Sequence, residues 1–234
     1  MLNINMKINV FNMLNNSILS QNNITNKIRR FRKYHSTLLE KICKEDDING
    51  AKWINYYYRN SESKMLNVSL LHGCVIIVDW LFINKYICFP CSQNDIIYNA
   101  ILNNHIELVE WISNNIEKLT TDAMDIAASN GDLPIVKWLH YNRKEGCTTF
   151  AMDWAASYGH LDVVKWLHHN RKEGCTCRAI DYAASNGHIE IVKWLHDNRK
   201  EGFSKDSIKK ASNKGHYEIG KLLRRYKLEG KKFY

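Results

Sequence analysis

The sequence predicts an all-α solenoid built from helix-turn-helix repeats, and three observations lead to this prediction. A nine-residue motif spanning Ala123–Gly131 recurs three more times at intervals of 28 residues. Within each repeat, apolar and small residues are spaced by three and four, which places them on one face of a helix. Nine of the eleven glycines follow an expected helix end, where glycine readily adopts the left-handed backbone conformation.

Each repeat is expected to contain two helices. In the repeat that starts at Ala151, the first helix is short and rich in alanine, which allows close packing against its neighbours. Thr149 precedes this helix as an N-cap would, and Thr121 and Ser204 do so in other repeats. The second helix carries the bulky residues, including Trp166, which we expect to fill the interface between repeats.

The spacing of the tryptophans extends the array toward the N-terminus. Residues 1–37 are expected to form a basic extension, either helical or disordered, and residues 38–234 the repeat array. The tryptophans in this frame are Trp53, Trp80, Trp111, Trp138, Trp166 and Trp194. The predicted repeats are 38–64, 65–95, 96–122, 123–150, 151–178, 179–206 and 207–234. A single pair of helices cannot bury its apolar faces, but stacked copies can.

The composition favours an intracellular, most simply cytoplasmic, protein. Seven cysteines and the absence of a secretory signal indicate free thiols in a reducing compartment. The longest apolar run, Cys74–Phe82, is interrupted by Asp79 and is too short to span a membrane. The formal charge of +9 is concentrated at the ends: residues 1–35 carry six bases and no acid, and residues 203–234 carry ten bases and three acids.

The repeated motif resembles the ankyrin repeat. Residues Ala183–Leu195 read Ala-Ala-Ser-Asn-Gly-His-Ile-Glu-Ile-Val-Lys-Trp-Leu, which is similar to the core of that repeat. The resemblance is closest over 123–219 and weaker toward the N-terminus. The usual ankyrin repeat has 33 residues, so a repeat of 28 implies that the hairpin loops are reduced. Asp125, Asp153 and Asp181 stand where ankyrin repeats usually have histidine.

The resemblance implies a binding scaffold without chemistry of its own. Repeats of this length look most like those of giant DNA viruses of amoebae and of some oomycetes, which implies a viral protein acting on host proteins inside the host cell. We therefore expect an unidentified protein partner, a monomeric chain, no membrane insertion and no enzymatic activity, cofactor or metal.

Positions that vary between near-identical repeats are the candidate partner contacts. Packing explains the invariant positions, so a varying residue is free to recognise a partner, and an aromatic one is a strong anchor. These residues could equally belong to a solvated face, and Trp154 and Tyr182 could be buried between repeats. The candidates are Ile126, Trp154, Tyr182, Tyr158, Tyr141, His169 and Asp197.

Two patterns that resemble sites are better explained by the scaffold. Histidines such as His140 and His168 recur once per repeat, too far apart to share a zinc ion. Cys88 and Cys91 have redox or zinc spacing but lack a second pair and a βαβ context. Two other functions stay open: binding of nucleic acid or an acidic surface through the basic ends, and an adaptor whose residues 1–37 recruit a degradation machine.

Overall fold

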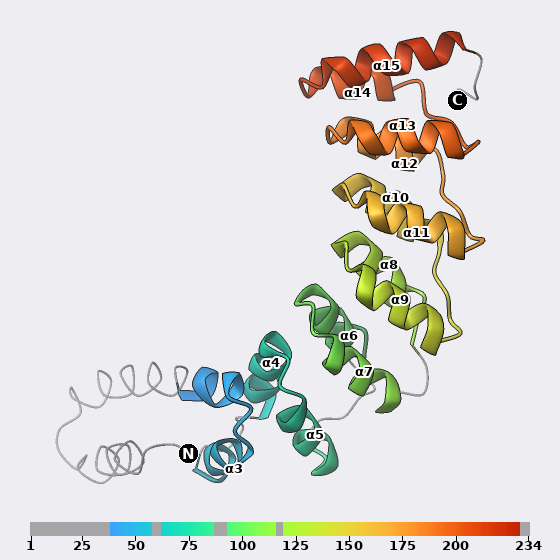
Figure 1. The fold of residues 1–234 in the computed structure, drawn as a ribbon. Helices are drawn as coiled ribbons and strands as arrows, with labels where there is room; N and C mark the ends of the chain where they lie inside the picture. The colour runs from blue at the N-terminus through green and yellow to red at the C-terminus, as the bar shows by residue number, and fades with distance from the viewer. Residues whose placement is uncertain (1–37, 58–61, 87–92, 116–118, 230–234) are drawn as a thin grey trace, which may run out of the picture. The chain divides into compact units, whose positions relative to one another are not determined.

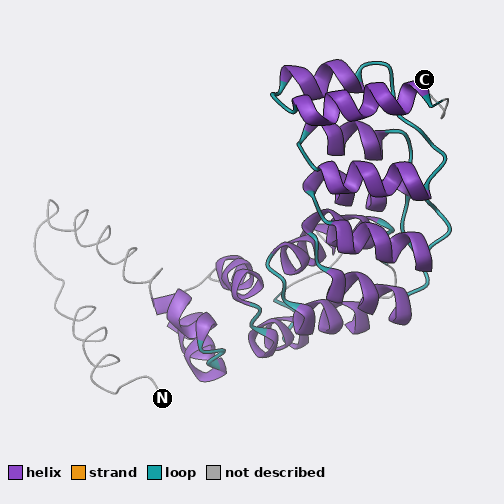
Figure 2. Cartoon of the chain, turned by 45° about the horizontal axis from the view of Figure 1, so that its top comes forward, coloured by secondary structure: helices purple, strands orange, loops and turns teal. Residues whose placement is uncertain are grey.

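The computed structural model describes residues 38–57, 62–86, 93–115 and 119–229 (Figure 1). The chain forms two compact units, one up to Cys91 and one from Ser92 onward. The described residues are helical and contain no β-strand (Figure 2). The predicted all-α fold of helix-turn-helix repeats is therefore confirmed.

The first unit contains short helices around a single apolar core. Residues 38–44 are helical and are followed by α3 (Ile48–Tyr57), α4 (Glu62–His72) and α5 (Val75–Ile83). Asp46 accepts hydrogen bonds from the backbone N–H groups of Ile76 and Ile77, both at 3.1 Å, and so satisfies the N-terminus of α5. The core consists of Leu39, Ile42, Cys43, Ala51, Ile54, Met65, Cys74, Ile77 and Leu81.

The second unit is a stack of helix pairs. Each first helix packs against the first helix of the next pair, and second helices do the same over α7–α13 (Figure 1). In the view of Figure 1 the second helices form the nearer layer, so the stack has two layers. The pairs are α6 (Gln93–Leu102) with α7 (Ile106–Asn115), α8 (Asp122–Asn130) with α9 (Leu133–Asn142), α10 (Thr149–Tyr158) with α11 (Leu161–Asn170), α12 (Arg178–Ser185) with α13 (Ile189–Asn198), and α14 (Ser207–Asn213) with α15 (Tyr217–Leu228).

Small residues on the first helices and branched residues on the second build the core. Ala155 and Ala156 are completely buried, and their small side chains allow α10 to approach α8 and α12 closely. Val163, Val164 and Leu167 are buried on α11. Burial of a large apolar side chain is worth roughly 1.5–3 kcal/mol, so the repeated pattern stabilises every interface between repeats.

The glycines adopt the expected left-handed conformation, but only some of them end a helix. Gly131 and Gly159 are the C-caps of α8 and α10, with φ of 78° and 92°. Gly146 and Gly174 also have positive φ, but α9 and α11 already end four residues or so earlier, at an extended arginine. The expectation that this second set ends the helices is therefore wrong, because these glycines lie inside the loop. Gly230 lies outside the described residues.

Two further expectations are corrected by the structure. The N-cap of α10 is Thr148, whose hydroxyl accepts from the N–H of Phe150, and Thr149 is the first helical residue. Trp166 is only partly buried and meets the ring of His140 edge-on, with ring centroids 5.1 Å apart. Trp166, and Trp194 in the same arrangement with His168, therefore cover the flank of the interface, while branched aliphatic side chains fill its centre.

Candidate protein-binding surface

A buried aspartate on α8, α10 and α12 holds the start of the next helix pair. Asp153 accepts hydrogen bonds from the backbone N–H of Thr176 at 2.8 Å and from its hydroxyl at 2.7 Å. Asp125 binds Thr148 in the same way, at 2.8 and 2.6 Å. The partners are 23 residues apart in each case, so every contact joins a first helix to the start of the next helix pair. These aspartates occupy the position at which the ankyrin motif usually has histidine.

The threonine of each pair connects this contact to the next helix. The hydroxyl of Thr176 donates to Asp153 and accepts from the backbone N–H of Arg178, at 3.2 Å. It thereby satisfies one of the unpaired N–H groups at the start of α12. Burial raises the pKa of Asp153 and of Asp125, and the threonine hydrogen bonds oppose that rise. A charged carboxylate is kept in the interior only because these donors face it.

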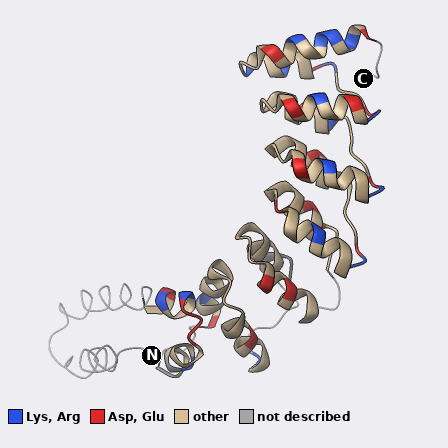
Figure 3. Cartoon of the chain, viewed as in Figure 1, with Lys and Arg blue, Asp and Glu red and all other residues tan. Residues whose placement is uncertain are grey.

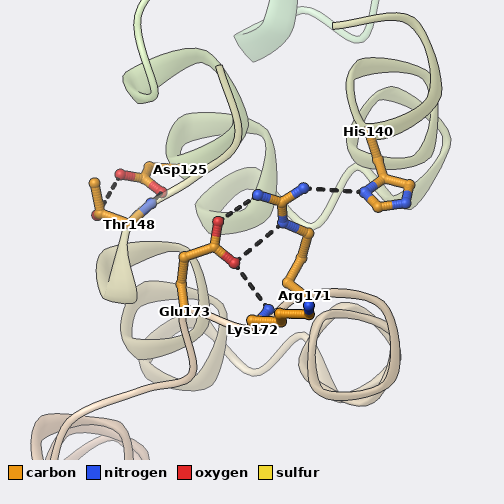
Figure 4. A network of polar contacts seen from close by, with 6 residues as sticks. All are labelled: Asp125, His140, Thr148, Arg171, Lys172 and Glu173. Atoms are coloured by element: carbon orange, nitrogen blue, oxygen red, sulfur yellow. Dashed lines mark hydrogen bonds and ion pairs between the residues drawn. The ribbon is translucent and has the colours of Figure 1, made fainter. Parts of the chain in front are cut away.

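A second contact joins the loops that follow the second helices. Arg171 forms an ion pair with Glu173 in its own loop, and its Nη1 donates to Nδ1 of His140 in the preceding repeat, at 3.3 Å (Figure 4). Arg199 repeats this arrangement with Glu201 and with His168. A Cβ added to Gly174 would lie 2.4 Å from Nη2 of Arg199. The glycine therefore leaves room for the arginine of the following repeat.

The earliest copy of this loop differs in its acceptor. Arg143 donates to the backbone oxygen of Ser113 at 2.9 Å, because serine replaces histidine there. The hydrogen bond from Arg143 lowers the pKa of Glu145 to about 2, against the opposing effect of burial. For Glu173 and Glu201, burial is the largest effect and raises the pKa, but the arginine and backbone hydrogen bonds together outweigh it and the pKa is lowered.

The two sets of contacts hold the repeats in register and expose one row of side chains on the first helices. On α10 this row contains Phe150, Trp154 and Tyr158, which are four residues apart and so lie on one helical face. Their exposed fractions are 40%, 37% and 63%. The rings of Phe150 and Trp154 are stacked, with centroids 5.0 Å apart and an interplanar angle of 12°. On α12, Tyr182 occupies the position of Trp154 and is 40% exposed.

We call Phe150, Trp154, Tyr158 and Tyr182 the aromatic surface. On α8 the position of Trp154 is held by Ile126, which is half-buried. Phe150 was not among the predicted contacts. It could have been found in the sequence, because it precedes Trp154 by four residues and therefore shares its helical face.

One variable position proves to be structural in two of the repeats. At the place of Tyr158, the neighbouring repeats have asparagine, and the Nδ2 atom of Asn186 donates to the backbone oxygen of Ser157 at 2.8 Å. Asn130 donates to the backbone oxygen of Ile101 at 3.2 Å. A residue that varies at this position can therefore still make a structural contact with the neighbouring repeat. Tyr158 is the aromatic residue at this position, and its side chain is exposed to solvent.

The remaining candidates lie on the second helices and belong to the other layer. Tyr141 is exposed at the end of α9, next to the ring of His140. His169 is exposed on α11, where its Nδ1 is 2.6 Å from the backbone oxygen of Lys165. Asp197 is exposed on α13. The structure therefore divides the candidates between two layers and brings together only Ile126, Trp154, Tyr158 and Tyr182.

The described residues offer little else that could form a site. Among them, no group of three His, Cys, Asp or Glu side chains is placed to hold a metal ion. Cys88 and Cys91 lie outside the described part of the chain. The described cysteines are free thiols, namely Cys43, Cys74, Cys147, Cys175 and Cys177. None of the helices in the described ranges has the length and apolar character needed to cross a membrane.

The fold and the contacts between repeats define a helical repeat protein of ankyrin-like architecture. In agreement, a family model described as ankyrin repeats (many copies) matches residues 152–196. This range begins in α10 and ends in α13, so it covers the part of the stack that carries Trp154 and Tyr182. The match supports the interpretation of the chain as an ankyrin repeat protein. No curated protein matches the chain.

Proposed function

We propose that this chain is a non-catalytic scaffold that binds another protein through the aromatic surface. Ankyrin repeats generally mediate protein–protein interaction, and the family is generally non-catalytic. The observation that supports this surface is the row of three aromatic side chains on α10, each at least a third exposed. Large rings are costly to leave in water and bring much contact area at little loss of side-chain entropy.

The finer parts of the proposal rest on the sequence pattern. The proposal includes seven repeats over residues 38–234, a monomeric state and an intracellular location. The free thiols of the described cysteines fit a reducing compartment. The resemblance to short repeats of giant DNA viruses and oomycetes is the reason for placing the partner among the proteins of a host cell.

Nucleic-acid or acidic-surface binding through the basic ends is the second candidate. The C-terminal helix α15 is rich in lysine and arginine (Figure 3). However, Lys221 is paired with Glu218 at 2.8 Å, and Arg225 lies 3.7 Å from Glu229. These acids reduce the positive field that a phosphate backbone would meet. Residues 1–37, on which the basic N-terminal arm and the degradation-adaptor alternative depend, lie outside the described residues.

The test compares partner capture by three forms of the full chain. The double substitution of Trp154 and Tyr182 to Ala removes the centre of the aromatic surface, and Tyr141→Ala removes an exposed ring from the other layer as a control. We expect proteins captured by the wild type from the native cell, and identified by mass spectrometry, to be lost with the double variant and retained with the control. Circular dichroism and thermal melting must show that all three forms are folded. Undiminished capture by a folded double variant would exclude this surface as the binding site.

A further inference from the structure

The row of exposed side chains on the first helices changes character along the stack. At the position of Trp154 on α10, the next repeat has Tyr182 and the one after it Lys210. The position of Tyr158 is occupied by Asn186 on α12 and by Lys214 after α14. The packing of α14 against α12 keeps the same register, because Ser207 and Ala211 are buried at the positions of alanines in the other repeats. The aromatic surface therefore continues into a basic one.

The basic end of this row keeps a net positive charge, although the charge of Arg178 also acts on the buried Asp153. Arg178, in the position of Phe150, and Lys210 are exposed, and no ion pair among the described residues includes either of them. On the second helices the situation is different, since Lys193 pairs with Glu190 and Lys221 with Glu218. The row on α14 also contains one exposed acid, Asp206, which holds the position of Phe150 and Arg178 and lies four residues before Lys210.

One more side chain extends the basic end of the row. Lys214 is exposed and donates to the side-chain oxygen of Asn186 at 3.2 Å, which ties it to the row on α12. We call Arg178, Lys210 and Lys214 the basic patch. It lies on the same side as the aromatic surface, because its residues hold the positions of Phe150, Trp154 and Tyr158 on the following first helices.

We propose that the combined surface binds an acidic peptide segment that carries one large apolar or aromatic anchor. This inference rests on the proposed function and adds the chemistry of the partner. The anchor packs on Phe150, Trp154 and Tyr158, and carboxylates of the segment pair with the basic patch. Complementary charge of this kind favours encounter and sets the orientation of the bound segment.

The spacing of the partner's residues follows from the stack. Neighbouring helices pack about 8–10 Å apart, so Arg178 lies about one such step from the α10 row and Lys210 about two steps. An extended segment advances about 3.3 Å per residue. The carboxylates are therefore expected about three and six residues from the anchor, on one side of it.

The distribution of charge favours this segment over a nucleic acid. A nucleic acid carries a uniform row of phosphates, so its binding site needs lysine or arginine side chains along the whole path of the strand. The row on the first helices has basic side chains only on α12 and α14, and it also carries two acids, Asp122 on α8 and Asp206 on α14. A ligand with an apolar part and an acidic part matches this polarity.

The experiment is a selection of random twelve-residue peptides displayed on phage against the full-length protein, followed by affinity measurements on the selected synthetic peptides. We expect a large apolar anchor with Asp or Glu about three and six residues to one side. The double charge reversal Arg178→Glu and Lys210→Glu is expected to weaken binding at least tenfold. The matched control, Lys193→Glu with Lys221→Glu, changes the net charge equally and is expected to stay within twofold of the wild type.

The other outcomes separate this inference from the proposed function. Selected peptides that lose affinity with Trp154→Ala but carry no acidic residues, and that ignore the charge reversal, would overturn the inference and leave the protein-binding function in place. Peptides that all ignore Trp154→Ala would count against the proposed binding surface itself. A 20-nucleotide single-stranded DNA that binds more tightly than any peptide, and is released by Arg178→Glu with Lys210→Glu, would show that the surface reads polyanions instead.

Discussion

Replacement of Asp153 by Ala should weaken the stack at one defined interface. The Asp153 side chain is completely buried and accepts two hydrogen bonds from Thr176 at the start of the next helix pair. A hydrogen bond to a charged group contributes about 1.5–3 kcal/mol, and a donor left buried without a partner costs about 1–3 kcal/mol. Relief from the burial of a carboxylate, which raises the pKa of Asp153, offsets part of the loss. We expect a net loss of about 2–4 kcal/mol in the free energy of unfolding.

The substitution should also change the shape of the unfolding transition. Asp153 and Thr176 belong to adjacent helix pairs, and the stability of a repeat array is approximately a sum of repeat and interface contributions. A weaker interface couples the two sides of the stack less strongly, so the urea transition followed by circular dichroism should become broader. Asp153→Asn retains an acceptor for the backbone N–H of Thr176 and should cost less, about 1–2 kcal/mol.

The control for this prediction is Asp197→Asn, an exposed position on α13. A surface substitution of this kind should change the free energy of unfolding by less than about 0.5 kcal/mol. If Asp153→Ala also stayed within that range, with a transition as sharp as the wild type's, the aspartate–threonine contact would not be holding the repeats together.

Two further predictions concern the loops after the second helices. Gly174→Ala should destabilise the fold by more than about 2 kcal/mol, because φ is +74° and the new Cβ would meet Arg199. The control Gly215→Ala should cost only about 1–2 kcal/mol, because φ is +87° there but no neighbour lies within 4 Å. Equal losses of unfolding free energy in urea would contradict the role of the arginine. The pKa of Glu145 is about 2, below its ordinary value of 4.5. Its contribution to stability is therefore complete above about pH 4.5 and is lost as the pH falls toward 2, so Glu145→Gln should flatten the dependence of unfolding free energy on pH between 5 and 3. An unchanged slope in the variant would show that Arg143 does not hold this carboxylate in the folded state.

Much of the local structure could be predicted from particular residues. The conserved spacing of Gly131 and Gly159 predicts turns, and both glycines do end their helices in the left-handed conformation. The prediction failed where neighbouring threonines compete for one role. Thr148 rather than Thr149 caps α10, because Thr148 also reaches the buried Asp125 of the preceding helix pair. A contact 23 residues away decided between them, and local sequence does not show such a contact.

The candidate site could be predicted only in part. Variation between repeats indicated Trp154 and Tyr182, and both are exposed. The same criterion also selected Tyr141, which lies on the other layer, and it missed Phe150, which stacks on Trp154. Variation shows that a position tolerates different residues, but it does not show which of these positions share a face.

The amino-acid sequence alone determined the repeat of 28 residues, the presence of two helices in each repeat and most of the residues that fill the core, since each depends on periodicity and propensity within about 30 residues. The tertiary structure decided that aspartate accepts hydrogen bonds from threonine at the start of the next helix pair and that arginine donates to histidine of the preceding repeat. It also decided that aromatic and basic side chains lie on the same side of the stack. These features depend on how far each repeat is translated and rotated against the next. That geometry arises from the packing of whole helices, so it became visible only when the stack was assembled.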